Sequence, residues 1–159
     1  MADEDRTKHR LQSVEIDEDS LAAVSRDQEQ ERQIAIFDLL EENFFFPEGA
    51  EAGPYDLRMG LLENRLVLDV RGPEYEKRHI LSLSPFRPLI KDYFLICESY
   101  YQAIRNSTPS QIEALDMGRR GLHNEAADLL RTRLQGKIET NLDTSRRLVT
   151  LICALHWRG

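Results

Sequence analysis

Apolar residues in the middle of the chain alternate with polar ones, whereas those in its second half recur at helical spacing. The alternation covers residues 55–61 and 66–70 and returns in residues 77–84. A period of two residues is typical of strands with one buried face. We therefore predict a hairpin that turns at Glu63 and Asn64, followed by a further strand.

Before this hairpin the sequence predicts a short edge strand and a loop. Val14 and Ile16 lie at strand spacing. Residues 44–54 contain two prolines and two glycines, residues that interrupt regular structure. We expect this second segment to be a loop.

The residues between that strand and that loop predict a long helix. Ser25 and Gln28 form a capping-box pattern, in which two side chains satisfy free N–H groups at a helix start. We expect the helix to run to about Asn43. Its apolar residues fall close to one stripe, which we expect to be buried: Ile34, Phe37, Leu40 and Phe44.

Residues 86–104 form the most regular amphipathic pattern of the chain, with apolar residues at i, i+3, i+4 and i+7 for five turns. Ser84 is the expected N-cap of this helix, and Pro85 its first residue, where a missing N–H does no harm. Cys97 lies on the apolar stripe. A buried thiol in a reducing compartment is the expected state for both Cys97 and Cys153.

Two further helices are predicted after residue 107. Thr108 and Gln111 form a second capping box. That helix is expected to end near Gln135, because Gly136 follows. Asp143 is the expected N-cap of a last helix that is buried on most sides.

Strands in the first half and helices in the second predict an α+β fold. We expect a small antiparallel sheet of three to four strands, mostly within residues 9–84. A long N-terminal helix and a C-terminal three-helix layer would cover it. The length of 159 residues fits one domain over residues 9–159, with residues 1–8 as a disordered tail.

Charge is unevenly distributed along the chain. The formal net charge is -7, yet residues 116–159 carry 8 basic and 5 acidic side chains. The acidic total disfavours a nucleic-acid partner. No apolar run approaches the ~20 residues that span a membrane, and the polar N-terminus does not resemble a secretory signal, so we expect a cytoplasmic protein without membrane contact.

The candidate site lies in the basic third, in the stretch "DMGRRGLHNE". On a helix, Asp116, Arg119, Arg120 and His123 share one face. One interpretation is an anion site, with two guanidinium groups on a phosphate or carboxylate and the imidazole as donor or acid–base. The other is a packing contact with solvated arginines. Gly118 and Gly121 each cost about 1 kcal/mol against alanine in a helix, so each needs a reason.

Other chemistry finds little support in the sequence. The four histidines are scattered, and no Cys-x2-Cys pair exists, so we expect no metal and no cofactor. No nucleophile or phosphate-loop motif indicates a catalytic residue. Trp157 near the C-terminus is expected either to seal the core or to contact a partner.

Three stretches carry a resemblance to a known family: "ENRLVLDVR", residues 81–125, and "LDTSRRLVTLICALHWRG". Together they resemble a family of bacterial proteins of the UPF series that has no assigned function. The resemblance covers about residues 9–159 and implies a bacterial cytoplasmic protein. It carries over no catalytic or binding residue.

Two functions follow as hypotheses. The first is a non-catalytic interaction or regulatory module that docks a protein partner, or a second copy of itself, through Arg119, Arg120 and His123, together with Arg146 and Arg147. The alternative is a small enzyme or binder of a phosphorylated small molecule. In that case Arg119 and Arg120 would hold the phosphate and His123 would move a proton.

Overall fold

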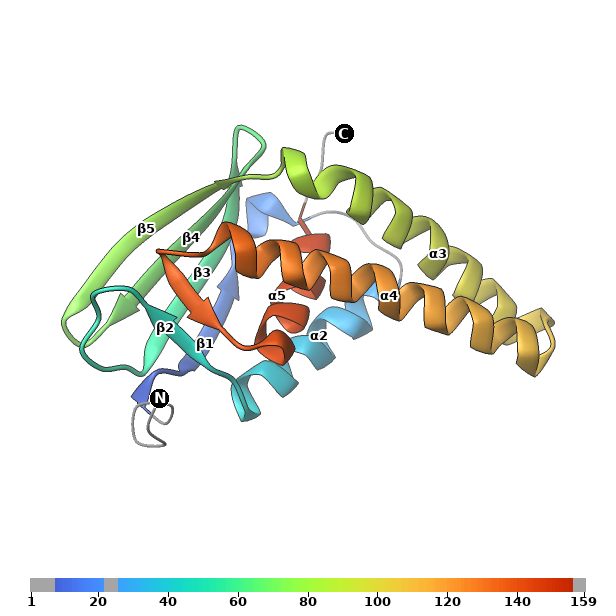
Figure 1. Cartoon of the computed structure of the whole chain (residues 1–159), viewed down its shortest axis with the longest axis horizontal. Helices are drawn as coiled ribbons and strands as arrows, with labels where there is room; N and C mark the ends of the chain where they lie inside the picture. The colour runs from blue at the N-terminus through green and yellow to red at the C-terminus, as the bar shows by residue number, and fades with distance from the viewer. Residues whose placement is uncertain (1–7, 22–25, 156–159) are drawn as a thin grey trace.

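Four strands form one sheet in the described part of the chain, and helices lie against one of its faces (Figure 1). The computed structural model describes residues 8–21 and 26–155, so residues 1–7 of the predicted tail lie outside it. The strand order is β1-β3-β4-β5, with β1 at Leu11–Ile16, β3 at Tyr55–Leu62, β4 at Arg65–Gly72 and β5 at Tyr75–Ser82. The predicted α+β class is thereby confirmed.

The β3–β4 hairpin turns where the sequence predicts it. Glu63 and Asn64 have φ values of 51° and 64°. Positive φ at both central residues is the geometry of a type I′ turn, whose twist matches that of the two strands.

The edge strand β1 is present as predicted but runs parallel to β3, so the sheet is mixed rather than antiparallel. Parallel neighbours need a long crossover connection, and residues 17–54 supply it. Alternation along a strand reports its buried face and not its direction. The sequence pattern therefore could not distinguish the two pairings.

A second, two-stranded sheet lies where we predicted only a loop. β2 at Phe45–Pro47 pairs antiparallel with β6 at Ile138–Thr140. Both strands have three residues, which is too short for a periodic pattern to show. The cause of the pairing is burial, since Phe45 is completely buried and Ile138 is 3% exposed.

Four helices make up the described helical layer: α2 at Arg26–Glu41, α3 at Arg87–Asn106, α4 at Pro109–Arg133 and α5 at Leu142–Cys153. α3 and α4 form a long antiparallel hairpin whose tip projects away from the sheet (Figure 1). α5 packs against both α2 and α4. None of the helices within the described residues is both long and apolar enough to cross a membrane.

The helix ends follow side-chain capping, though not always the predicted cap. Thr108 accepts from the backbone N–H of Gln111, and the reciprocal bond of the predicted capping box is also present. The prediction for Asp143 is wrong, because the Asn141 side chain accepts from the N–H of Thr144 at 2.9 Å and starts α5 two residues earlier. Ser84 is also not a helix cap, since it begins a short 3-10 turn before α3. Ser25 lies outside the described residues.

The predicted stripe of α2 is wrong in part. Ile34 is 51% exposed and Phe37 is 62% exposed, while Ala35 and Leu39 are buried. α5 packs against α2. The buried face of α2 is thus set by its neighbour and not by the largest apolar side chains. Two of those side chains are left in solvent.

One hydrophobic cluster joins the inner face of the sheet to all four helices. Cys97 and Cys153 are buried in it as free thiols. Burial raises the pKa of Cys97 to about 11 and raises that of Cys153 as well. Both thiols are therefore protonated at neutral pH, which makes them poor nucleophiles. Trp157 is not among the described residues.

Candidate functional site

The five predicted site residues line one open groove of about 350 Å³. α2, α4 and α5 form its walls, and Tyr93 of α3 lies in its floor. The predicted residues come from α4 and α5, whereas α2 adds lining residues that the sequence did not indicate. These added residues are Glu31, Ile34, Ala35 and Asp38.

Arg119 is held inside the protein by two carboxylates. Its Nη1 donates to Glu31 Oε1 at 2.9 Å, and its Nη2 donates to Asp116 Oδ1 at 2.8 Å. The guanidinium also lies 4.2 Å from the centroid of the Tyr100 ring, a cation–π contact. Only 21% of this side chain is exposed. Both ends of its fork are thus occupied by α2 and by α4 itself.

Arg120, Arg146 and Arg147 are less constrained. Arg120 is 68% exposed and places Nε 3.1 Å from Asp116 Oδ2. Arg146 Nη1 is 3.9 Å from Asp143 Oδ1, and its Nε is buried without a hydrogen-bond partner among the described residues. Arg147 is half-buried at the same groove.

Four arginines and two carboxylates line the groove, but Asp116 and Asp143 beside it pair with Arg119, Arg120 and Arg146, so the local charges balance. Its cations are the four arginines and its anions are Glu31 and Asp38. Glu31 is already paired with Arg119. Arg147 is the lining arginine for which the described residues show no ion pair, so it is the cation most available to an anionic group.

His123 is a half-buried histidine that is uncharged at neutral pH. Its Nε2 lies 3.1 Å from Thr150 Oγ1, and its ring stacks on Tyr93 with the centroids 5.4 Å apart. Burial lowers the pKa of His123 to about 4, and the positive charge of Arg146 and then of Arg119 adds to that effect. At neutral pH this imidazole is uncharged, so it is not in the protonated form that a general acid needs.

The two glycines of α4 have different surroundings. A Cβ at Gly118 would lie 2.5 Å from Ile96 Cδ1 on α3, so α3 and α4 approach closely there. A Cβ at Gly121 would have no described atom within 4 Å. The predicted packing reason therefore exists for Gly118, whereas at Gly121 the described residues show none.

Alanine at these two positions is expected to separate the two cases. Gly121→Ala should raise the free energy of unfolding by about 1 kcal/mol, because the helix gains propensity without a clash. Gly118→Ala should gain much less, or lose stability, because Ile96 must move. Urea unfolding of both variants measures the difference. An equal gain at both positions would contradict the close contact.

A larger hollow of about 760 Å³ lies between the β2–β6 sheet and the end of α4. Its charges nearly cancel, with Glu48, Asp128 and Glu139 set against Arg131 and Lys137. The described residues also contain no cluster of three or more His, Cys, Asp or Glu side chains that could hold a metal. The groove at α2, α4 and α5 is the described hollow in which the predicted basic residues meet.

Comparison with known proteins identifies a family but no fold relative. The chain matches the uncharacterised protein family UPF0262 over residues 8–158. A UPF0262 protein of Phenylobacterium zucineum is 86% identical over 159 residues, and one of Caulobacter vibrioides is 69% identical over 159 residues, each covering all of both chains. One of Azorhizobium caulinodans is 59% identical over 155 residues, covering 95% of this chain and 96% of that protein. No solved structure matches the chain.

Proposed function

Since the chain belongs to the uncharacterised bacterial protein family UPF0262, we propose a function from the geometry of the groove itself. The protein is a non-catalytic interaction module of the cytoplasm. It binds an acidic, partly apolar segment of a protein partner between α2, α4 and α5.

One observation carries this proposal: three incompletely neutralised arginines and an exposed isoleucine meet in one open groove. Arg120, Arg146 and Arg147 supply the cations, and Ile34, 51% exposed, supplies an apolar contact. Phe37, 62% exposed, follows one helical turn later on α2. Arginine and aromatic side chains beside one another are typical of the energetic centre of protein interfaces.

The alternative of a phosphorylated ligand has weaker support. Of the proposed clamp, Arg119 is occupied by Glu31 and Asp116, and His123 is neutral with a pKa of about 4. A phosphate would have to be held by Arg120, Arg146 and Arg147. The unpartnered Nε of Arg146 is the feature that favours this binding mode.

Affinity capture from native lysate tests the proposal when a groove variant is compared with a matched control. Arg120→Glu/Arg147→Glu reverses two groove charges. Arg131→Glu/Arg133→Glu makes the same change in net charge at exposed positions at the end of α4, outside the groove. We expect one set of partners to be recovered by wild type and control and reduced at least ~10-fold by the groove variant, a loss of about 1.4 kcal/mol in binding.

Two controls accompany the experiment. Circular dichroism must show that both variants fold, and nuclease treatment must leave the partners bound. Equal recovery by the groove variant would contradict the proposal. A rise in melting temperature with phosphorylated metabolites, lost in the groove variant, would instead support the phosphorylated ligand.

A further inference from the structure

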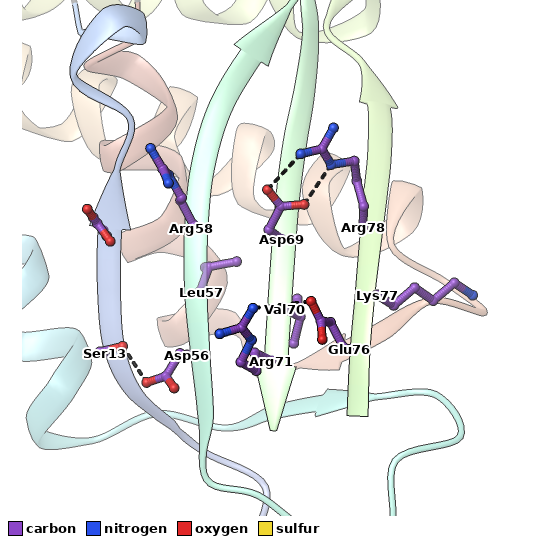
Figure 2. A pocket seen from close by; sticks show the side chains of 11 residues that line it. Ser13, Asp56, Leu57, Arg58, Asp69, Val70, Arg71, Glu76, Lys77 and Arg78 are labelled. Carbon is purple, nitrogen blue, oxygen red and sulfur yellow. Dashed lines mark hydrogen bonds and ion pairs between the residues drawn. The ribbon is translucent and has the colours of Figure 1, made fainter. Parts of the chain in front are cut away.

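Charged side chains form two rows across the open face of the four-stranded sheet, which Figure 2 shows with the helices behind it. Each row takes residues that are directly paired on neighbouring strands, in the order β1, β3, β4, β5. The first row is Glu15, Arg58, Asp69 and Arg78. The second row is Ser13, Asp56, Arg71 and Glu76.

The sign of charge alternates along the first row and along the three charged residues of the second, and oppositely charged neighbours form ion pairs within the chain. Arg78 donates to both carboxylate oxygens of Asp69, at 2.7 and 3.2 Å. Arg71 donates to Glu76 at 3.2 Å. These pairs are exposed, and exposed pairs contribute little to stability. What they do is hold the charged groups at fixed places on the face (Figure 2).

In a row of alternating charges across four strands, reversing the strand order puts a charge of opposite sign at every position. Such a row can therefore pair with a reversed copy of itself. A two-fold axis parallel to the strands, in front of the face and midway between β3 and β4, places a second copy face to face with the first. Each row then lies against the same row of the second copy in reverse strand order. Arg58 then faces Asp69 of the second copy, and Glu15 faces Arg78. In the second row, Asp56 faces Arg71. Each of these charges meets its opposite.

Ser13 also has a complement across this axis. Ser13 would face Glu76 of the second copy, a hydroxyl donor against a carboxylate. In the next row of the face, Gly60 pairs with Val67, and Val67 pairs with Ile80. This row does not add to the contact, because Asp17 and Ser20 of the same chain cover the space above Gly60 and Val67 is only 7% exposed.

We propose that this face binds a second copy of the chain about that two-fold axis. Sheets that pack face to face keep their strand directions within about 30°, so the rows would remain nearly opposite. The two charged rows, about 6.8 Å apart on four strands about 4.8 Å apart, cover about 260 Å² per copy. That is well below the ~800 Å² per partner of a standard interface, so the dimer is weak and depends on its charges.

Two single charge reversals test the axis, because each should abolish the homodimer and the mixture should restore it. In a homodimer of Asp69→Arg, the introduced arginine faces Arg58 of the second copy. In a homodimer of Arg58→Asp, the introduced aspartate faces Asp69 of the second copy. When the two variants are mixed, an arginine faces an aspartate at both contacts. We expect each variant to dimerise at least tenfold more weakly than wild type in sedimentation velocity, and an equimolar mixture to recover wild-type affinity.

Further variants and salt show whether the dimer depends on this face. Glu113→Arg makes the same change in net charge as Asp69→Arg at an exposed site near the start of α4, away from the sheet, and should dimerise like wild type. So should Arg120→Glu/Arg147→Glu, which keeps this proposal independent of the groove. Raising the salt from 0.05 to 0.5 M should weaken the wild-type dimer at least fivefold, a test that needs no variant. A monomeric wild type at high concentration, or a mixture that stays monomeric, would overturn the proposal.

Discussion

Lowering the pH from 7 to 4 is expected to cost the wild-type protein on the order of 3 kcal/mol of unfolding free energy through His123 alone. Burial against Tyr93 and Thr150 lowers its pKa to about 4, whereas an unfolded histidine titrates near 6.5. Between these two values the unfolded chain binds a proton that the folded chain does not. The stabilisation is therefore complete above about pH 6.5 and is lost as the pH falls toward 4.

The comparison that isolates this effect is His123→Gln. Glutamine keeps a hydrogen-bonding group near Thr150 but does not titrate. Urea unfolding of both proteins at several pH values from 7 to 4 should give a flatter pH dependence for the variant. His79, whose pKa is also lowered by burial, contributes in the same direction but equally in both proteins. Parallel curves would show that His123 is not held neutral by burial.

This result would also bear on the two functional hypotheses. A general acid must carry a proton at working pH, and catalytic groups are tuned near that pH. A histidine with a pKa of about 4 is poorly suited to that role. Confirmation of the pH dependence would leave His123 as a half-buried residue of the groove that holds α4 against Thr150 of α5. This structural role of His123 is all that the proposed interaction module requires.

The elements that could be predicted are those whose cause is local in sequence. The capping box at Thr108 depends on residues three positions apart, and the hairpin turn depends on alternation on either side of Glu63 and Asn64. The direction of β1 and the pairing of β2 with β6 have no local cause. β2 and β6 are about 90 residues apart in sequence and pair because the fold brings them together.

The candidate site shows the same division. The shared face of Arg119, Arg120 and His123 follows from helical spacing, and the structure places all three at one groove. Glu31, which holds Arg119, lies 88 residues earlier. Ile34 was expected in the core and instead lines the groove. Neither could be assigned before α2 was placed beside α4, because amphipathic spacing does not say which neighbour covers which face.

Arg119→Ala is expected to lower the free energy of unfolding by about 2 kcal/mol, whereas Arg120→Ala should change it by less than about 0.5 kcal/mol. Arg119 is 21% exposed, is held by two carboxylates and lies over Tyr100. Its removal leaves Glu31 partly buried without this partner. Arg120 is 68% exposed, and its removal leaves Asp116 still bonded to Arg119.

A double-mutant cycle of Arg119→Ala with Glu31→Ala, followed by urea unfolding, measures how much of this loss belongs to the pair. We expect a coupling of about 1 kcal/mol or more, because both side chains are largely shielded from solvent. Equal small effects of Arg119→Ala and Arg120→Ala would place both arginines on a solvated surface. If Arg119→Ala alone has a large effect, a loss of binding in an Arg119 variant could come from a disturbed helix layer as readily as from a lost contact. Binding studies of the groove must then vary Arg120, Arg146 and Arg147.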